Sequence, residues 1–575
     1  MAINKYPVER RQRPNTVVTV DSSGIGSSSA NTDKAIVILG SAKGGQPNVP
    51  YQLTSYPQAK DIFRSGTLLD GIELAWNASD AGIGAGTIYA VRVDEASQAT
   101  LDQDPVIFTS LLYGADANQL TLSLEDNALT ATKRLRIVDG VTNTSEVFDN
   151  LGSIFYLKYT GDSAVAQATI ANKTLSIKVG ATAEALTEVV SYKLDSTAFG
   201  KVSKIIADLS LHEGFEASFL PFGDKDIDSV ELDEVADLDI KTPEKGGVLT
   251  GLIGDIINQT RYSNFVSASR KVDSVAKLEN FVSKPLTGGT DGTVPASWSK
   301  ALNAIANDDV NLAYYVVPLS SQPNIHSEVA TFVKEQTNQG FPLRAFVGGD
   351  KGENLTQIFT RKNRIYSDRV GLIGFSAEVR MGDGRIVEQP PYMVASMVAG
   401  LASGLGVGEP ITNKPLTVIS TPNALSNDQL DQLHLNGVIG ISKMRSRSTG
   451  SSFRITSDVT TYTGSADPVR TTVSLGEESD FLAVGLRERL DEEVLGASTG
   501  VITASILRPI IYTYFLEKQN RQEIVGFDGS NISVAIMGNS VRISVPVIPS
   551  RGIDYIDARI IYTNDSQDSQ ETTTI

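Results

Sequence analysis

The stretch EQPPYMVASMVAGLASGLGVGEPITNKPL, Glu388–Leu416, decides how the rest of the chain is interpreted. Its Gln-Pro-Pro start interrupts any preceding strand, because proline has no N–H for a sheet ladder and restrains its neighbour. From Tyr392 to Val407 there is no charged residue, and small residues alternate with Met, Val and Leu. This run is marginal in length for a bilayer span. It predicts a helix buried inside a soluble protein, with close packing through Ala395, Ala399, Gly400 and Ser403.

A second helix is predicted after Pro410 and Pro415, in LSNDQLDQLHLNG, Leu425–Gly437. Ser426 or Asn427 can cap its amino end, and the helix is expected to end near the glycine. Its apolar stripe is predicted to consist of Leu430, Leu433 and Leu435. Neither helix carries a nucleophile beside a base or a cluster of metal ligands. The two helices therefore indicate a packing module.

This arrangement, followed by the Gly-Val-Ile run of Gly437–Ile441, resembles the core domain of contractile-tail sheath proteins of bacteriophages. Two further stretches are similar to the same family. PLTGGTDGTVPASWSKAL, Pro285–Leu302, is similar to the family's Gly-Gly-x-Asp-Gly loop and the helix after it. Ala35–Phe63 is similar to its first strand and Gly/Pro turn. The length and the inserted middle are most similar to sheaths of large phages of Gram-positive hosts.

The resemblance implies a structural subunit of a tail sheath that polymerises helically around the tail tube and contracts to drive the tube through the host envelope. Its implied partners are other copies in stacked hexameric rings, the tail tube protein, and the baseplate and tail terminator proteins. It implies a place in the virion tail after assembly in the host cytoplasm. A sheath of a bacterial contractile injection system is the nearest alternative, and an α/β enzyme is a more distant one.

Composition restricts the chemistry of this 575-residue chain. It has no cysteine and only three histidines, His212, His326 and His434, which lie far apart in the sequence. Disulfides, thiolate metal sites and thiol catalysis are excluded, and each histidine is expected at a surface or an edge. The net charge of −17 argues against nucleic acid as a partner. No apolar run follows the early charges, so no signal peptide and no membrane insertion are expected.

Two motifs that would indicate a ligand are incomplete. Near Gly44-Gly45, Lys43 precedes the glycines and no Lys-Ser/Thr follows, so the phosphate-loop pattern is broken. The DKDID run that begins at Asp224 starts like a calcium loop, but Ser229 and Val235 occupy the positions that need Gly and Glu. We therefore expect no cofactor, no metal and no enzymatic activity.

The chain is predicted to be a multidomain α+β and α/β protein. An arm and linker at 1–32 precede a discontinuous α/β domain at 33–96 and 211–364, because strands alternate with helices in both parts. Short alternating runs separated by turns predict an inserted antiparallel β domain at 97–210. A sheath core domain is expected at 365–563 and a polar tail at 564–575.

Both ends carry candidate interface strands. Thr16, Val17, Val18, Thr19 and Val20 form a β-prone run between Pro14 and a Ser/Gly linker. This strand either folds back on its own domain or is donated to a neighbour, which the resemblance favours. Near the other end, a half-buried strand is predicted with one face made of Ile556, Ala558, Ile560 and Tyr562.

Two basic clusters in the last third are candidates for contact with the tube. One consists of Lys443, Arg445 and Arg447, and the other of Lys518 and Arg521 near the end of a helix expected at Ser505–Ile524. A sheath must release its tube during contraction, so weak and separable charge pairs suit this contact. The alternative is that both clusters are solvated surface.

Overall fold

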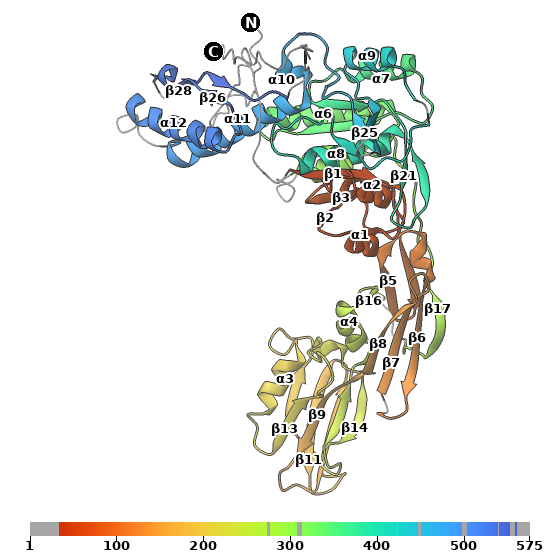
Figure 1. The fold of residues 1–575 in the computed structure, drawn as a ribbon. Helices are drawn as coiled ribbons and strands as arrows, with labels where there is room; N and C mark the ends of the chain where they lie inside the picture. The colour runs from red at the N-terminus through yellow and green to blue at the C-terminus, as the bar shows by residue number, and fades with distance from the viewer. Residues whose placement is uncertain are drawn as a thin grey trace, which may run out of the picture.

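The centre of the molecule is a six-stranded sheet in the order β2-β3-β1-β18-β19-β20 (Figure 1). This computed structural model describes residues 34–130, 132–272, 276–306, 313–422, 424–446, 450–496, 503–538, 540–552 and 558–559. All neighbouring strands of the sheet are parallel except β2, which runs antiparallel to β3. The strands are β1 (Ala35–Gly40), β2 (Pro50–Leu53), β3 (Ile88–Arg92), β18 (Ala313–Pro318), β19 (Arg344–Gly348) and β20 (Val370–Ile373).

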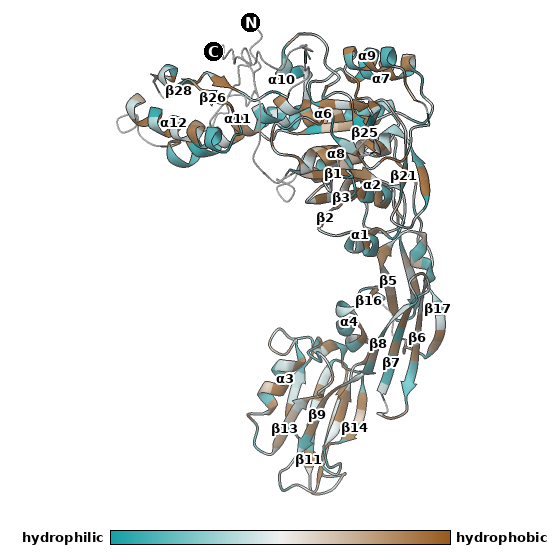
Figure 2. Ribbon diagram, viewed as in Figure 1, coloured by the Kyte–Doolittle hydropathy of each residue, from teal (hydrophilic) through white to brown (hydrophobic). Residues whose placement is uncertain are grey.

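Helices cover both faces of this sheet, which accounts for its continuous apolar strands. Ile36 and Ile38 of β1 face one buried cluster, while Val37 and Leu39 face another. Figure 2 shows the hydrophobic colour of strands at the centre of the sheet. The first face packs against α1 (Tyr56–Phe63), α2 (Thr67–Trp76) and α8 (Pro391–Gly404); the second packs against α5 (Ser299–Ile305), α6 (Pro323–Asn338) and α7 (Leu355–Ile365).

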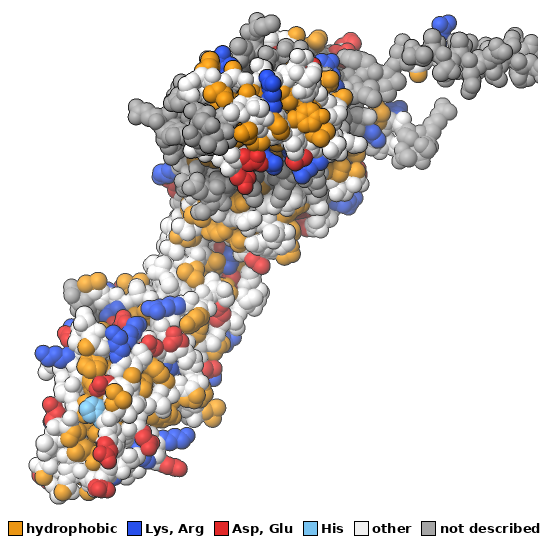
Figure 3. All heavy atoms as spheres, turned by 90° about the vertical axis from the view of Figure 1, so that its left-hand side faces the viewer, with side chains coloured by type: hydrophobic (Ala, Val, Ile, Leu, Met, Phe, Trp, Pro, Cys, Tyr) orange, Lys and Arg blue, Asp and Glu red, His pale blue; other side chains and the backbone are white. Residues whose placement is uncertain are grey.

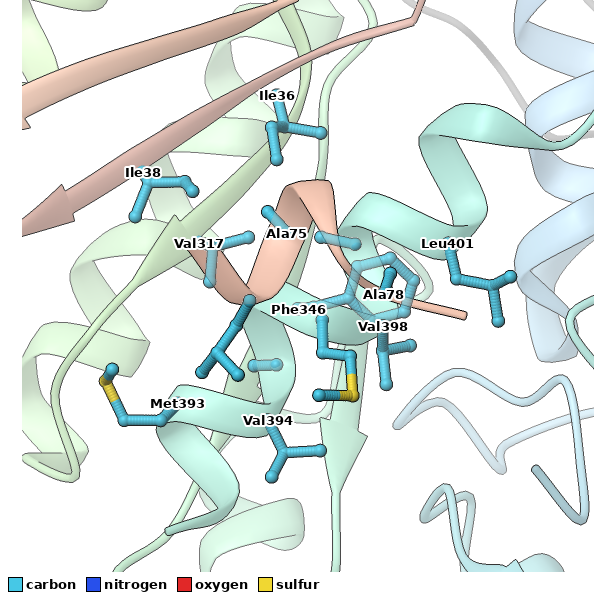
Figure 4. Close-up of a cluster of buried hydrophobic side chains, with 14 of the residues drawn as sticks. Ile36, Ile38, Ala75, Ala78, Val317, Phe346, Met393, Val394, Val398 and Leu401 are labelled. Atoms are coloured by element: carbon cyan, nitrogen blue, oxygen red, sulfur yellow. The ribbon is translucent and has the colours of Figure 1, made fainter. Parts of the chain in front are cut away.

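Helix α8 is the uncharged helix predicted from the sequence, and its predicted burial is confirmed. Nearly every side chain from Met393 to Ser403 is buried. Figure 4 shows Val394, Val398 and Leu401 of this helix within the cluster that also contains Ile36 and Val317. A Cβ at Gly400 would overlap the Ala75 carbonyl oxygen, so only glycine allows α2 and α8 to approach this closely.

The chain leaves the sheet after β3 and builds a β region beside it, shown below the α/β body in Figure 1. Two sheets, β16-β5-β4 and β17-β6-β7-β8, enclose one apolar core that includes Phe108, Leu122 and Ile137. The elements are β4 (Gln98–Gln103), β5 (Val106–Tyr113), β6 (Leu120–Asn127), β7 (Thr132–Asp139), β8 (Thr144–Leu151), α4 (Leu252–Gln259), β16 (Val266–Arg270) and β17 (Phe281–Pro285).

A second β region lies at the far end of the molecule (Figure 1). Its sheets, β12-β11-β10-β14 and β13-β9-β15, enclose a separate core around Phe155, Ile177 and Leu249. The elements are β9 (Ser153–Tyr159), β10 (Val165–Ala171), β11 (Thr174–Gly180), β12 (Thr187–Lys193), α3 (Val202–Leu209), β13 (Phe215–Phe219), β14 (Val235–Asp239) and β15 (Gly247–Thr250).

The structure corrects two boundaries expected from the sequence. The inserted part was predicted to end at residue 210, but strands β13 to β17 pair within the two β regions, so the insertion continues to about Pro285. A core domain was predicted to begin at residue 365, but β20 belongs to the central sheet and α8 packs on it. Residues after 365 therefore complete the hydrophobic core around the central sheet.

The second predicted helix is α9 (Asn427–Leu435), capped by a reciprocal pair of hydrogen bonds between Ser426 and Gln429. Its predicted stripe is partly wrong: Leu433 is buried, but Leu435 is 75% exposed, because residues two apart in a helix do not lie on the same face. The elements around it are the hairpin β21 (Ala377–Arg380) and β22 (Ile386–Gln389), and the sheet of β23 (Pro415–Leu416), β25 (Gly450–Ile455) and β24 (Ile441–Ser446).

The last elements form a small unit with its own apolar core, which includes Leu486, Ile511 and Phe515. It projects from the α/β body at the left of Figure 1. We call it the C-terminal unit: the second half of α11 (Val473–Glu493), α12 (Ala504–Asn520), β26 (Gly526–Phe527), β27 (Ser533–Met537), β28 (Ser540–Ser544) and β29 (Val547–Ile548). A short helix, α10 (Pro468–Thr471), precedes α11.

The histidine prediction is correct for two of the three residues. His212 and His434 are exposed, whereas His326 is fully buried in α6. Its Nε2 lies 2.7 Å from the Ser320 carbonyl oxygen, and burial lowers its pKa to about 4. A neutral imidazole with one backbone partner can be buried at little cost, so the expectation of a surface position fails here.

Candidate assembly interface

The amino ends of the central strands carry polar side chains that all face the first half of α11. Lys34, just before β1, places its Nζ 2.6 Å from Glu477 Oε1 and donates also to the Gly406 carbonyl. The Tyr315 hydroxyl at the start of β18 donates to the other oxygen of Glu477, and the Gly408 N–H donates to Oε1 at 3.2 Å. A buried carboxylate with this many partners holds α11 against the sheet edge.

Asp480, one turn further along α11, forms a second buried group of contacts. Its Oδ2 lies 2.6 Å from Arg369 Nη1, 3.1 Å from Arg344 Nε and 2.6 Å from the Tyr314 hydroxyl. Burial acts to raise the pKa of Asp480, but the two guanidinium groups outweigh it and the pKa is lowered. Asp480 is therefore an anion that bridges β18, β19 and the approach to β20.

The burial of the acidic residues in the first half of α11 was not predicted from the sequence. The helix begins at Val473, and Glu477, Glu478 and Asp480 are all buried. Charged helical residues usually face water, so composition argued for an exposed helix. The sequence offered one sign of these buried carboxylates. Lys34, Tyr314, Tyr315, Arg344 and Arg369 stand at or near the starts of buried strands, where they require anionic or acceptor partners.

The Gly-Gly-x-Asp-Gly loop fastens the place where the chain leaves and re-enters the α/β body. Asp291 accepts from the Ala115 N–H at 2.9 Å and pairs with Lys43, while its carbonyl accepts from Arg92 Nη2 at 3.1 Å. Arg92 is fully buried and pairs through Nε with Asp94 at 3.2 Å. Gly289 allows close contact, because a Cβ there would lie 2.6 Å from the Gly114 carbonyl oxygen.

Most of the predicted interface strands lie outside the described residues. This applies to Thr16, Val17, Val18, Thr19 and Val20 at the amino end, and to Ile556, Ile560 and Tyr562 at the other end. Ala558 is described and lies in no strand of the structure. The predicted pairing of these segments stays a prediction.

The two basic clusters lie on separate elements and differ in their surroundings. Lys443 and Arg445 are exposed on β24, with Lys443 Nζ 5.4 Å from the centre of the Phe453 ring; Arg447 lies outside the described residues. Lys518, in contrast, is 2.6 Å from Glu523 Oε2, and Arg521 lies 3.9 Å from the same carboxylate. Glu523 therefore offsets the charge of Lys518, while the side chain of Arg521 remains 64% exposed.

Exposed apolar side chains gather on the C-terminal unit. Figure 3 looks toward the end of the molecule that this unit forms and shows hydrophobic side chains grouped at the top. Its sheets are small: β27 pairs with β28, and β26 with β29, and among the described strands no third strand joins either pair. The exposed apolar residues here are Leu495, Ile506, Tyr512, Leu516, Val525, Ile536, Met537, Val541 and Ile548.

No metal centre is found in the part of the chain that the structure describes. No group of three or more His, Cys, Asp or Glu residues among the described residues is arranged to hold a metal ion. Within the same residues, no helix is both long enough and apolar enough to cross a membrane. The main features are the exposed apolar residues of the C-terminal unit, the buried contacts of Glu477 and Asp480, and the basic residues Lys443 and Arg445 of the hairpin β24–β25. Together they indicate a protein that assembles with other chains.

Comparison with known proteins agrees with this description. Residues 292–461 match the family model of the phage tail sheath protein central domain. The tail sheath protein of Staphylococcus phage Twort is 39% identical over 592 residues, covering 98% of this chain and 99% of the relative. A protein of Enterococcus phage phiEF24C is 40% identical over 571 residues, with the same coverage. The crystal structure of a sheath tail protein from Desulfitobacterium hafniense has the same fold, with a TM-score of 0.55 at 14% identity over 91% of this chain and 94% of that chain.

The chain belongs to the phage tail sheath family. It is a structural subunit of a contractile phage tail and a virion component, and it belongs to a class of proteins that are not enzymes. The relatives come from phages of Enterococcus and Staphylococcus, which agrees with the expected likeness to phages of Gram-positive hosts.

Proposed function

We propose that subunits polymerise by strand exchange, in which the arm at Thr16–Val20 of one copy is added to a two-stranded sheet of a neighbour's C-terminal unit. The observation that carries this proposal is the pair of small sheets in the C-terminal unit, each of which has only two strands among the described residues, together with the exposed apolar residues of this unit. A two-stranded hairpin is marginal by itself, and unpaired edges accept further strands. A five-residue strand would add about four to six backbone hydrogen bonds, each worth ~1 kcal/mol net.

The carboxyl-terminal strand with Ile556, Ala558, Ile560 and Tyr562 on one face is proposed to join the same composite sheet. Donated strands would keep neighbouring subunits connected while each moves as a nearly rigid body. The resulting assembly is a helical stack of hexameric rings around the tail tube protein, ended by baseplate and tail terminator proteins and built in the host cytoplasm. Nucleic acid binding and membrane insertion form no part of this role.

Different parts of the chain are proposed to occupy different positions in the assembly. We place the α/β body and residues 365–552 against the tube and neighbouring subunits, because the basic hairpin of β24 and β25 and the C-terminal unit belong to this part. The two inserted β regions, which lie away from the C-terminal unit in Figure 1, are assigned to the outer surface.

Removal of residues 1–20 tests the proposal. The truncated protein should remain a folded monomer, because the described core begins at Lys34, and it should form no cylinders in electron microscopy. Normal cylinders from the truncated protein would overturn strand exchange at this end.

The receiving sheet is tested by placing lysines at Ile536 and Val541, an exposed cross-strand pair of β27 and β28. The expected result is a stable monomer that no longer polymerises, since charge blocks an apolar strand contact. Leu211→Lys is the matched control, because Leu211 is 84% exposed on the far β region. Unchanged polymerisation of the double variant would remove this hairpin as the receiving site.

A further inference from the structure

Glu478 is a buried ionisable group whose role the contacts described above leave unexplained. It follows Glu477 on α11, is 1% exposed, and neither of its carboxylate oxygens has a hydrogen-bond partner among the described residues. An orphaned buried carboxyl is rare in folded proteins and is expected to have a reason. Its position is informative, because α11 joins the central sheet to the C-terminal unit.

The chain packs closely on this side chain. The turn at Gly406–Glu409 lies directly on it: Gly408 has a φ of +75°, and a Cβ there would lie 3.2 Å from both Cβ and Oε2 of Glu478. Glu523, which is buried after the end of α12, raises the pKa of Glu478 through its like charge. Glu478 therefore lies in the joint between the turn, α11 and the C-terminal unit.

The charges around Glu478 are either acidic or already paired. Glu477 and Glu523 both act on it with like charge. Lys34 is bound to Glu477 and the Gly406 carbonyl, and Lys518 and Arg521 lie against Glu523. Burial, reinforced by the two neighbouring carboxylates, raises the pKa of Glu478 to about 9. At neutral pH the closed joint therefore holds a neutral carboxyl group.

We propose that protonation of Glu478 controls this joint. When the carboxyl is protonated, the turn and the corner after α12 pack closely on α11, and when the proton is lost, these contacts open. The open state exposes the carboxylate to water, where it ionises with an ordinary pKa of about 4.3. The sign follows from this difference, because a group with a raised pKa in the closed state stabilises closure at acidic pH and loses that contribution as pH rises. The closed joint should lose stability as pH rises from about 4.3 to about 9, while the central sheet stays folded throughout.

The experiment is hydrogen–deuterium exchange of the full-length monomer between pH 6 and 8, corrected for intrinsic exchange rates. Peptides covering 405–412 and 516–526 report the joint, and peptides covering β1 and β19 report the sheet. In the wild-type protein, protection of the joint should fall by up to about 100-fold across these two pH units, while the sheet peptides remain unchanged.

Two variants and one control make the result specific. Glu478→Gln removes the titrating group at nearly constant size and should make joint protection independent of pH; Glu478→Met should do the same if the amide variant folds poorly. Glu492→Gln, at an exposed position of the same helix, should behave as the wild-type protein. Equal loss of protection in wild-type and Glu478 variants, or constant protection of the joint in the wild-type protein, would overturn the proposal. Neither outcome bears on strand exchange, which involves other residues.

Discussion

At the residue scale, the fold depends on a few side chains that average rules misjudge. Gly400 has no Cβ, which allows α8 to approach α2 closely. The carboxyl of Glu478, which has no hydrogen-bond partner among the described residues, lies against the turn at Gly406–Glu409. The small residues of α8 could be recognised from the sequence, because a charge-free run of Ala, Gly and Ser has few other uses in a soluble protein. The buried charges of α11 could not, since the lysine and arginine partners of Glu477 and Asp480 come from segments more than one hundred residues away.

Asp480 gives a prediction at this scale. Asp480→Asn leaves Arg344 and Arg369 buried without their shared anion, so unfolding free energy should fall by about 3–5 kcal/mol. Because the pKa of Asp480 is lowered in the folded protein, its contribution is present above the ordinary carboxyl pKa of about 3.9 and is lost as pH falls below it.

Denaturant titrations at pH 7 and at pH 3 to 4 measure both effects. The variant should differ most from the wild-type protein at pH 7 and least in acid. A variant as stable as the wild-type protein at pH 7 would contradict this description of the joint. Glu492→Gln, at an exposed position of the same helix, serves as the control.

At the scale of elements, alternating strands and helices were predictable because each has a strong local pattern. The alternation predicted for residues 33–96 is present as β1, β2, α1, α2 and β3, and the alternation predicted within 211–364 is present from α5 to α7. The extent of the insertion was not predictable in the same way. The partners of β13 and β15 are both β9, and only long-range pairing reveals that these strands belong to the far β region.

The basic hairpin gives a prediction at this scale. Replacing Lys443, Arg445 and Arg447 by Glu should leave sheath-only polymerisation intact but prevent assembly around tubes in the extended form, because like charges would then face tube carboxylates. Replacing Lys518 and Arg521 by Glu should have a smaller effect on tube contact, since both already lie against Glu523.

Electron microscopy of sheath and tube mixed at low and moderate salt provides the measurement. If both reversed clusters assembled with tubes as the wild-type protein does, shape complementarity rather than charge would hold the sheath on its tube.

The carboxyl-terminal strand gives a second prediction for an element. Ile560→Pro removes a backbone donor from the ladder, so the variant should remain a folded monomer that forms no cylinders. Circular dichroism and electron microscopy of the same preparation check both parts. Ordinary cylinders from this variant would exclude Ile560 from the composite sheet.

At the scale of the whole molecule, the chain combines an α/β body with two parts that extend from it. The inserted β regions are connected to the body at the contact between Arg92 and Asp291. The C-terminal unit is connected to it at the buried contacts that Glu477 and Asp480 make with the central sheet. Arg92, Glu477 and Asp480 at these connections are buried, while Asp291 is partly exposed. Assembly itself was predictable only through family likeness, because a strand completed by a neighbour has no partner within its own sequence.

A cryo-electron microscopy map of assembled cylinders tests the central claim most directly. The account predicts density for Thr16–Val20 of one subunit as a strand beside β27–β28 or β26–β29 of a neighbouring subunit. Density that follows the same five residues back onto the sheet of their own subunit would contradict strand exchange.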